Sequence, residues 1–452
     1  MKVTTHTTPS QPVGELSFEQ SYVSADAERP NKVAFYNRYL LTVLLVVLAF
    51  SYVDRAVFAL LQQPIKTDLH FSDSQLGVLN GVGFALFFGI MGIPLARWAD
   101  RGDRVAIIAL TTGIWSASVS LCGTASTFLF LLLWRVCTAV GEAGCGPTAN
   151  SLLPEYFSRA ALPRAVGVYM LGAPLGTAVG YLAGGWLAQT VGWRDTFYIV
   201  GVPGLALATL AAISLREPRR AHTKKPIGTI EGAHGNISSN ASFKSVVQLF
   251  LHQTTLRHLW LCYLIWYFCG WGLQQWLPTF FLRSHGIATK DVGVWFAAAS
   301  ILGGMLGSWL GGELSSRWAA NNEQLQLQGT AVLFVLLTFF FGAALVVSDV
   351  HVAFGALTLA YLAAAMLFAP LIATIQTLVP SHMRATMLAL GTLLPTFIGM
   401  GLGPTTAGAL SDAIHPFAAE ESLRYALLGI CPGFCLAAWC AWRASRSVAL
   451  SL

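Results

Sequence analysis

Four ionisable residues lie inside long apolar stretches of the chain: Asp54, Arg55, Arg135 and Glu142. The remaining Asp, Glu, Lys and Arg residues fall in polar segments or near the ends of apolar stretches. A charge at the centre of a lipid bilayer costs about 2.5–3.5 kcal/mol on insertion scales. Two acids and two bases in such surroundings therefore predict compensating ion pairs that face a cavity.

The spacing of these residues limits how they can pair. Arg135 and Glu142 are seven residues apart, so on a helix they share one face but lie roughly 10 Å apart along the axis. Each then needs a partner on the stretch that carries Asp54 and Arg55, which point about 100° apart around a helix. Asp54 with Arg135 and Arg55 with Glu142 is one consistent pairing, and the spacing alone does not exclude others.

The chemistry of the four residues suggests proton and anion handling. A carboxyl group in an apolar cavity can gain or lose a proton as water or a guanidinium group approaches it. We expect Asp54 and Glu142 to couple proton movement, and Arg55 and Arg135 to bind an anionic part of a substrate. The alternative is that the four charges only hold two helices together. Because the second half of the chain has no buried acid, coupling is expected in the first half.

The composition predicts a polytopic α-helical membrane protein. Of 452 residues, 55% are hydrophobic and 11% are charged, whereas soluble proteins carry about 25% charged residues. A spanning helix needs roughly 20 mainly apolar residues. Twelve such stretches are found, at 39–65, 75–97, 105–124, 127–150, 165–190, 195–215, 257–282, 290–315, 327–347, 351–378, 386–411 and 423–443.

The order of these stretches predicts two six-helix bundles, at 39–215 and 256–445. A disordered cytoplasmic tail is expected at 1–38, a cytoplasmic linker at 216–255 with a short amphipathic helix near 243–251, and a short cytoplasmic tail at 446–452. Basic residues concentrate in segments that place both termini in the cytoplasm. The polar start of the chain has no early apolar core, so no cleavable signal peptide is expected.

Glycines recur at four-residue spacing in several stretches, which gives a helix one smooth face. The main set is Gly172, Gly176 and Gly180 in the fifth stretch and Gly403 in the eleventh. Further members are Gly77, Gly81, Gly184, Gly303, Gly307, Gly311, Gly399 and Gly408. Generic helix packing explains any single pair. The set as a whole predicts smooth surfaces on which two bundles rock against each other.

Aromatic and amide residues supply further candidates for a substrate cavity. The seventh stretch carries Trp271, Gln274 and Gln275, and the tenth carries Tyr361. Aromatic faces suit a lipid tail and amides suit a head group. The tryptophans could instead anchor the helix at the membrane interface. Asn80 and Gln376 are secondary candidates.

The loop Asp100-Arg101-Gly102-Asp103-Arg104 resembles the signature loop between the second and third helices of the major facilitator superfamily. A second copy ends at Arg317, with Ser316 where an acid is common, and Ala96 replaces the leading glycine of the first copy. The resemblance implies an all-α fold of twelve transmembrane helices in two pseudo-symmetric bundles. It also implies gating roles for Asp100, Arg101, Arg104 and Arg317.

A narrower resemblance rests on four short motifs: Tyr52-Val53-Asp54-Arg55, Arg135 with Gly141-Glu142-Ala143, Pro174-Leu175-Gly176 and Trp276-Leu277-Pro278. Their order and spacing are similar to those of the Spinster family of lysolipid and sphingolipid transporters. This implies a proton-dependent, alternating-access carrier of an amphipathic molecule with an anionic head, of the lysophospholipid or sphingosine-phosphate type. The alternatives are an exporter of a different organic solute or drug, and a ligand-binding membrane sensor that does not transport.

The sequence argues against other classes of protein. A lipid-processing enzyme would need a nucleophile with a base, or a metal cluster, at membrane depth. The histidines fall in loops or at the ends of apolar stretches, no metal-binding motif occurs, and the phosphate-binding loop of ATP-driven pumps is missing. We expect neither enzyme activity nor a metal or cofactor. The expected partners are a small amphipathic substrate, protons and membrane lipids, but no nucleic acid, for a monomer in a bacterial inner membrane.

Overall fold

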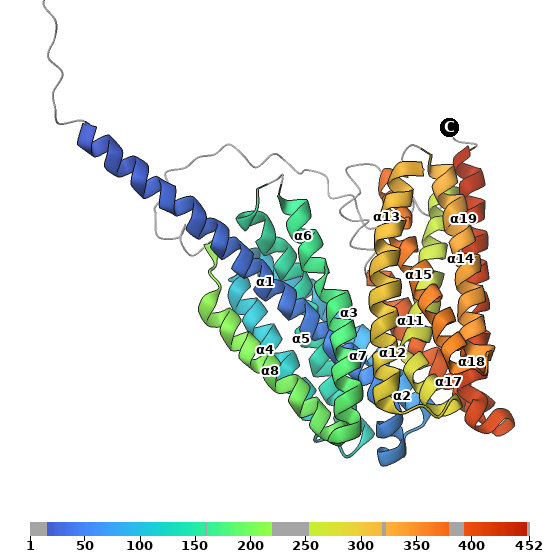
Figure 1. The fold of residues 1–452 in the computed structure, drawn as a ribbon. Helices are drawn as coiled ribbons and strands as arrows, with labels where there is room; N and C mark the ends of the chain where they lie inside the picture. The colour runs from blue at the N-terminus through green and yellow to red at the C-terminus, as the bar shows by residue number, and fades with distance from the viewer. Residues whose placement is uncertain (1–15, 159–160, 219–252, 319–321, 379–392, 450–452) are drawn as a thin grey trace, which may run out of the picture.

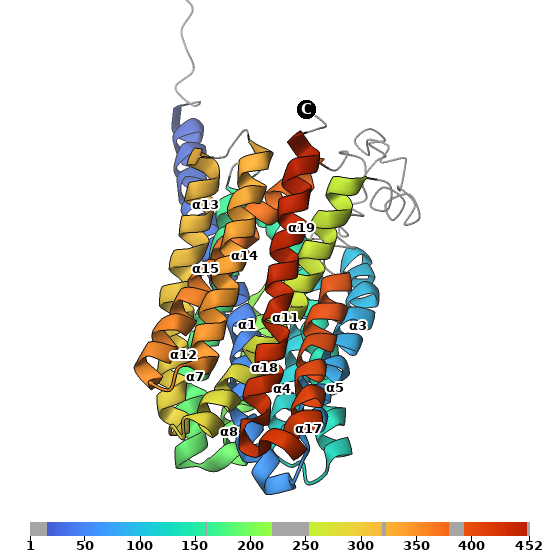
Figure 2. The ribbon, with the colours of Figure 1, turned by 90° about the vertical axis from the view of Figure 1, so that its right-hand side faces the viewer.

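The computed structural model describes residues 16–158, 161–218, 253–318, 322–378 and 393–449. These residues form helices, and no strand is found among them. The helices group into two bundles (Figures 1 and 2). The predicted helix at 243–251 lies outside the described residues, as does most of the predicted linker.

Six membrane crossings make up the N-terminal bundle, and two of them are broken into shorter helices. The elements are α1 (Leu16–Leu69), α2 (Asp73–Asn80) with α3 (Val82–Arg101), α4 (Arg104–Cys122), α5 (Phe128–Tyr156), α6 (Leu162–Met170) with α7 (Gly172–Thr190), and α8 (Gly192–Ser214). The second and fifth crossings are the broken ones.

Six further crossings make up the C-terminal bundle. The elements are α11 (Thr254–Ser284), α12 (Thr289–Ala299) with the π-helix η1 (Ser300–Met305) and α13 (Leu306–Trp318), α14 (Glu323–Val346), α15 (Val350–Leu378), the π-helix η3 (Thr396–Leu402) with α17 (Gly403–Ala418), the short 3₁₀ turn η4 (Ala419–Glu421), and α18 (Ser422–Ile430) with α19 (Pro432–Ala449).

The described helices account for the twelve predicted crossings. Ten helical stretches are long and apolar enough to span a bilayer, and the last of them, 393–448, contains two crossings joined by a turn. The remaining crossing is α11, whose 31 residues exceed the length that a span needs. The tryptophans, tyrosines and glutamines of α11 lower its mean hydropathy. The predicted all-α fold of two six-helix bundles is therefore the observed one.

The first helix begins much earlier than predicted. We expected a disordered tail up to residue 38, whereas α1 starts at Leu16 and continues into the first crossing without interruption. Figure 1 shows this blue helix projecting well beyond its bundle. Residues 16–38 contain no apolar run, so a search for membrane spans could not detect their helix. Glu and Ala in this segment favour a helix once the following crossing has nucleated it.

Polar side chains mark where several helices begin. At α2, the Ser72 hydroxyl accepts from the Gln75 backbone N–H while the Gln75 side chain accepts from the Ser72 N–H. At α4 the Asp103 carboxylate accepts from the Ala106 N–H, and at α5 the Thr127 hydroxyl accepts from the Phe130 N–H. These side chains satisfy backbone donors that the first helical turn leaves unpaired. They hold the crossings that carry the candidate site in register.

The main set of predicted glycines packs within single bundles, which differs from the prediction. A Cβ atom added to Gly176 would lie 2.0 Å from the Ala49 carbonyl oxygen, and one added to Gly180 would lie 2.8 Å from that of Val53, so this stripe meets α1 in its own bundle. Gly172 also packs on α1, and Gly403 packs on α11. They are not the surfaces between bundles that we expected, because spacing identifies a smooth face but not the helix that covers it.

Three further members of the predicted set, Gly77, Gly81 and Gly408, do form the contact between the bundles, together with Gly293, which was not in the set. A Cβ on Gly77 would lie 2.8 Å from the Pro404 carbonyl oxygen, and one on Gly293 would lie 2.3 Å from that of Tyr181. The bundles therefore meet along two seams, α2 with α17 and α7 with α12. Figure 1 shows them converging toward the end where α2 and α17 lie and diverging toward the end that carries the C-terminus.

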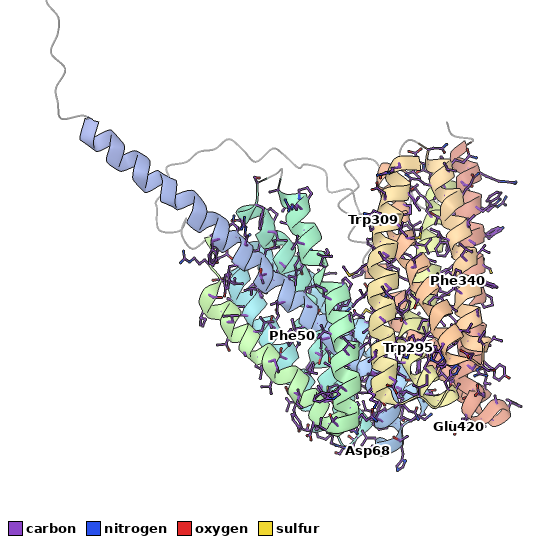
Figure 3. The ribbon with its side chains drawn as sticks, in the orientation of Figure 1. Phe50, Asp68, Trp295, Trp309, Phe340 and Glu420 are labelled. Atoms are coloured by element: carbon purple, nitrogen blue, oxygen red, sulfur yellow. The ribbon has the colours of Figure 1, made fainter. Side chains whose placement is uncertain are left out.

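Both bundles present apolar side chains to their surroundings. Trp309 is 64% exposed on α13, and Figure 3 shows such side chains along the length of the helices. Asp68 and Glu420 lie at the converging end, where polar residues are found (Figure 3). This division between an apolar flank and a polar end is what a membrane requires of a spanning bundle.

Candidate functional site

The four predicted charges form two ion pairs between α1 and α5. Arg135 Nη1 donates to Asp54 Oδ2 over 2.8 Å. Arg55 donates to Glu142 Oε2 from Nε over 2.9 Å and from Nη2 over 2.6 Å. Of the pairings that the spacing left open, the structure has Asp54 with Arg135 and Arg55 with Glu142. Their roles in transport stay predictions.

The two pairs differ in their exposure. The side chains of Asp54, Arg135 and Glu142 are at most 2% exposed, whereas that of Arg55 is 13% exposed. Asp54 Oδ1 and Glu142 Oε1 have no hydrogen-bond partner among the described residues. Each carboxylate thus keeps one oxygen available to a proton, and Arg55 is the member of the set that a ligand can reach.

Aromatic rings line both guanidinium groups. The Phe84 ring centroid lies 5.3 Å from Arg55 Cζ and 4.9 Å from Arg135 Cζ, so one ring serves both pairs. Tyr52 and Phe88 approach Arg55, and Phe58 approaches Arg135. Such cation–π contacts contribute about 0.5–2 kcal/mol, more when water is excluded. They help to offset the loss of hydration of the two arginines.

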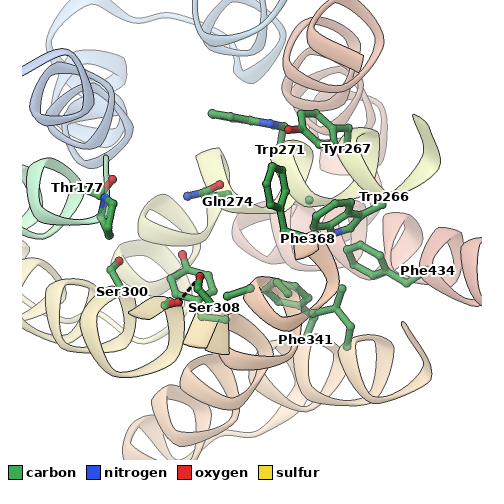
Figure 4. A pocket seen from close by; sticks show the side chains of 17 residues that line it. Thr177, Trp266, Tyr267, Trp271, Gln274, Ser300, Ser308, Phe341, Phe368 and Phe434 are labelled. Atoms are coloured by element: carbon green, nitrogen blue, oxygen red, sulfur yellow. Dashed lines mark hydrogen bonds between the residues drawn. The ribbon is translucent and has the colours of Figure 1, made fainter. Parts of the chain in front are cut away.

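The C-terminal bundle contains an aromatic cavity of about 370 Å³. Figure 4 shows Trp266, Tyr267 and Trp271 of α11 on one side of it, with Phe341 and Phe368 nearby. A few uncharged polar groups interrupt these rings: Thr177 from α7, Gln274, Ser300, Ser308 and Tyr361. No charged side chain is among the described residues that line this cavity, so its chemistry suits an apolar or aromatic group.

Most of the predicted cavity residues do line this space. Trp271, Gln274 and Tyr361 face it, and the Tyr361 hydroxyl has no partner among the described residues. Gln275 does not line it. Its side chain is buried and its backbone carbonyl accepts from Gln62 Nε2 over 2.6 Å. Consecutive helical residues point about 100° apart, so Gln274 and Gln275 cannot both face one cavity.

The two secondary candidates gave different outcomes. Asn80 is 1% exposed, and neither its amide oxygen nor its amide nitrogen has a partner among the described residues. The Gln376 side chain lies outside the described residues. Asn80 is therefore a buried polar residue near the end of α2, while the structure adds nothing on the Gln376 side chain.

One residue connects the charged pairs with the aromatic cavity. Trp271, which lines the cavity, packs against a buried cluster that contains Phe84 and Met400, with Phe88 at its edge. Phe84 and Phe88 are the rings that cover Arg55. A path of contacts therefore runs from the ion pairs of one bundle to the cavity of the other.

The signature loop residues lie within single bundles. Arg104 is fully buried and binds Glu155 over 2.7 Å, Glu217 over 2.5 Å and the Ser151 carbonyl, all in the N-terminal bundle. Arg317 pairs with Glu313 on its own helix and is 72% exposed. Asp100 and Arg101 are exposed at the end of α3. Arg104 and Arg317 thus make contacts within their own bundles, and the gating roles of the four residues stay predictions.

A closure between the bundles lies at their converging ends, and sequence reasoning missed it. Asp73 binds Lys66 over 2.6 Å and receives both terminal nitrogens of Arg283 at 2.8 and 2.7 Å. The Ser411 hydroxyl donates to the same carboxylate over 2.6 Å. Asp412 accepts from the first backbone N–H groups of α2. From the sequence, no functional role was expected for Asp73, Lys66 or Arg283.

Comparisons with known proteins agree with this arrangement. Residues 43–404 match the profile of the Major Facilitator Superfamily. The chain is 32% identical to an MFS-type efflux pump of Mycolicibacterium smegmatis over 89% of its length and 91% of that protein. It is 24% identical to the sphingosine-1-phosphate transporter SPNS2 of Xenopus tropicalis, over 91% of its length and 82% of that protein.

A solved structure extends the likeness to three dimensions. The crystal structure of a bacterial homolog of the human lysosomal transporter Spinster, in an inward-facing and unoccupied conformation, superposes with a TM-score of 0.79 at 28% identity. The match covers 91% of this chain and 97% of that one. The chain is therefore a multi-pass transporter that belongs to the Major Facilitator Superfamily and is similar to its Spinster-type members.

Proposed function

We propose that the protein is a proton-coupled secondary transporter that carries an amphipathic molecule with an anionic head by alternating access. The observation that supports the proposal is that a charged site and an apolar site lie close to each other. Arg55 lies in a charged cluster on one bundle, and Trp271 connects that cluster to a 370 Å³ aromatic cavity on the other. A lysophospholipid or sphingosine phosphate has the same two parts, a charged head and an apolar tail.

The Arg55–Glu142 pair supplies a route for coupling. While Glu142 is ionised, it engages Arg55 through two hydrogen bonds. A proton on Glu142 removes the attraction and frees the guanidinium group, whose planar fork can hold a phosphate through two donors. Asp54 and Arg135 form the more deeply buried pair, which responds to the same local charge. Proton and substrate binding are thereby linked.

The closure at Asp73 supplies a gate for alternating access. Asp73 belongs to α2, whereas Arg283 and Ser411 belong to the opposite bundle. Separating the bundles at this end breaks those contacts but leaves Lys66 on Asp73, because both lie in one bundle. With both termini in the cytoplasm, as the basic residues indicate, this closure faces outward from a bacterial inner membrane. One chain contains the whole site, so a monomer suffices.

A second candidate function is the efflux of an apolar organic solute that has no anionic head. The relative at 32% identity is named an MFS-type efflux pump. The described lining of the aromatic cavity carries no charge, so a solute that used this cavity alone would not need Arg55. The two candidates differ in whether the charged cluster contacts the solute.

The test is transport into proteoliposomes that hold the purified protein under an imposed pH gradient. A lysophosphatidate and a monoacylglycerol with the same acyl chain differ in the head group alone. We expect the gradient to stimulate transport of the phosphate-headed lipid, and Glu142→Gln to abolish the stimulation. Equal transport of both lipids favours the second candidate. Saturable binding without flux of either lipid would identify a sensor and overturn both.

A further inference from the structure

The second crossing of the N-terminal bundle is broken at Gly81, between α2 and α3. Gly81 has φ −101° and ψ −108°, outside the helical region. The next backbone N–H, that of Val82, donates to Thr405 Oγ1 of the opposite bundle over 3.2 Å. The Thr405 hydroxyl in turn lies 3.0 Å from the Gly77 carbonyl and 2.9 Å from that of Gly401. One hydroxyl of the C-terminal bundle thus bridges the break in α2–α3.

The two helices approach so closely at this contact that Gly81 has no room for a side chain. A Cβ atom added to Gly81 would lie 2.3 Å from both the Gly401 carbonyl oxygen and Thr405 Oγ1. Any residue other than glycine at position 81 would push the bundles apart here. A buried N–H that loses its acceptor costs about 1–3 kcal/mol. The start of α3 is therefore sensitive to whether the other bundle is in place.

The first turn of α3 also carries the ring that the two ion pairs share. Phe84 follows Val82 by two residues, and its backbone N–H donates to the Gly81 carbonyl over 3.0 Å. Its ring contacts the guanidinium groups of both Arg55 and Arg135. The position of this ring therefore depends on the first turn of α3, whose Val82 N–H donates to Thr405.

The surroundings of the pairs leave few other groups that could sense the bundle contact. Among the described residues, Arg55, Arg135, Cys122 and Cys145 each interact with at least one of the two carboxyls, and Tyr52 interacts with Arg55. All of these lie in the N-terminal bundle. From the C-terminal bundle, Tyr267 interacts with Tyr52, while Met400 and Trp271 belong to the cluster around Phe84 and carry no charge.

We propose that Thr405 is a positioning residue that holds the Phe84 ring against the two guanidinium groups while the bundles are closed at this end. When the bundles part, Val82 loses its acceptor, the first turn of α3 relaxes, and Phe84 no longer shields the pairs. Protonation of the carboxyls and separation of the bundles are thereby coupled through one hydroxyl. The inference rests on the proton coupling proposed above and names a residue through which it acts.

The test compares Thr405→Val, which removes the hydroxyl but keeps the shape, with Thr405→Ser, which keeps the hydroxyl. Thr330→Val is the matched control, since Thr330 is a buried threonine of the same bundle whose hydroxyl bonds only within α14. Hydrogen exchange of a peptide that spans residues 78–88 reports the backbone amides around the break and the first turn of α3, including the Val82 N–H. Proteoliposome flux with and without a pH gradient reports the coupling.

We expect Thr405→Val to speed exchange in this peptide at least tenfold and to reduce stimulation by the gradient at least threefold. Binding of the lipid at one fixed pH should change less than twofold. Thr405→Ser and Thr330→Val should behave like the unmodified protein in all three measurements. A role for Thr405 in folding alone would lower the yield and binding of the valine variant without changing the ratio of flux with and without the gradient.

A second variant tests whether Thr405 acts through Phe84. Phe84→Leu keeps an apolar side chain but removes the ring, and should reduce gradient stimulation to a similar extent. Adding Thr405→Val to Phe84→Leu should then reduce it little further, because residues that act in series are not additive. Full additivity would overturn the proposed route through Phe84.

The outcomes separate this inference from the proposed function. If the unmodified protein transports the lipid without any response to the gradient, proton coupling is wrong and the inference falls with it. If the unmodified protein responds and Thr405→Val responds equally, with exchange unchanged, proton coupling stands and the role of Thr405 is overturned.

Discussion

The two bundles share an architecture but differ in what their interiors contain. The N-terminal bundle holds two ion pairs between α1 and α5 and a third charged cluster around Arg104. The C-terminal bundle holds aromatic rings and uncharged polar groups around its cavity. Buried charges persist only where each has a partner, whereas aromatic rings need none. Two bundles of the same architecture can therefore contain different chemistry, with buried ion pairs in one and an apolar cavity in the other.

The largest expected effect comes from breaking the most deeply buried pair. Asp54→Asn leaves the Arg135 guanidinium without its carboxylate, and arginine cannot lose its proton in a protein. Removing one partner of such a pair costs about 3–5 kcal/mol. Arg135→Gln should cost less, because the remaining Asp54 can take up a proton. Thermal unfolding in detergent, followed by intrinsic fluorescence, measures both variants.

The double variant Asp54→Asn with Arg135→Gln is the control for this prediction. It removes both charges and should recover much of the stability that Asp54→Asn loses. Equal midpoints for the two single variants would show that these charges are less isolated from water than their burial indicates, and the contrast between the bundle interiors would weaken.

The two copies of the signature loop allow a second comparison between the halves. Arg104→Gln should destabilise the protein by about 3 kcal/mol, because it removes the guanidinium charge from beside the Glu217 carboxylate, whose side chain is 1% exposed. Arg317→Gln should cost less than about 0.5 kcal/mol, because an exposed pair on one helix contributes little. The same unfolding assay compares them. A loss of stability in Arg317→Gln that matched Arg104→Gln would show that the second copy is also structural.

A smaller effect is expected for the head group. Arg55→Ala should weaken binding of the phosphate-headed lipid about ten- to a hundredfold, the range of a lost charge-assisted hydrogen bond. Arg55→Lys keeps the charge but not the fork, so its loss should be intermediate. Calorimetric titration at one pH, with a neutral lipid of the same chain length, measures the difference. Equal losses for both lipids would mean that Arg55 only stabilises the bundle.

The smallest effect is expected in the aromatic cavity. Phe368 lines it and is 52% exposed, so Phe368→Ala should leave the fold intact while removing apolar contact area. We expect affinity for a long-chain lipid to fall about fivefold, and affinity for a short-chain analogue to fall less. Phe339→Ala is the control, because Phe339 is 67% exposed and does not line the cavity. An equal change in lipid affinity for both variants would show that the lipid tail does not bind in this cavity.

Several features of the protein could be predicted from the sequence alone. Apolar stretches of spanning length predicted the twelve crossings, because a bilayer excludes unpaired polar groups over a known thickness. The isolation of Asp54, Arg55, Arg135 and Glu142 within those stretches predicted ion pairs. Helical spacing also restricted which residues could pair. These properties are local, since they depend on hydrophobicity and on the period of one helix.

Other features were decided only when the bundles packed together. Glycine spacing could not show that Gly176 meets α1 while Gly81 meets Thr405, since it defines a face and not its neighbour. The closure joins Asp73 to Arg283 and Ser411, which are 210 and 338 positions away along the chain. Contacts of this kind depend on how two complete bundles dock, and no periodicity within one helix carries that information.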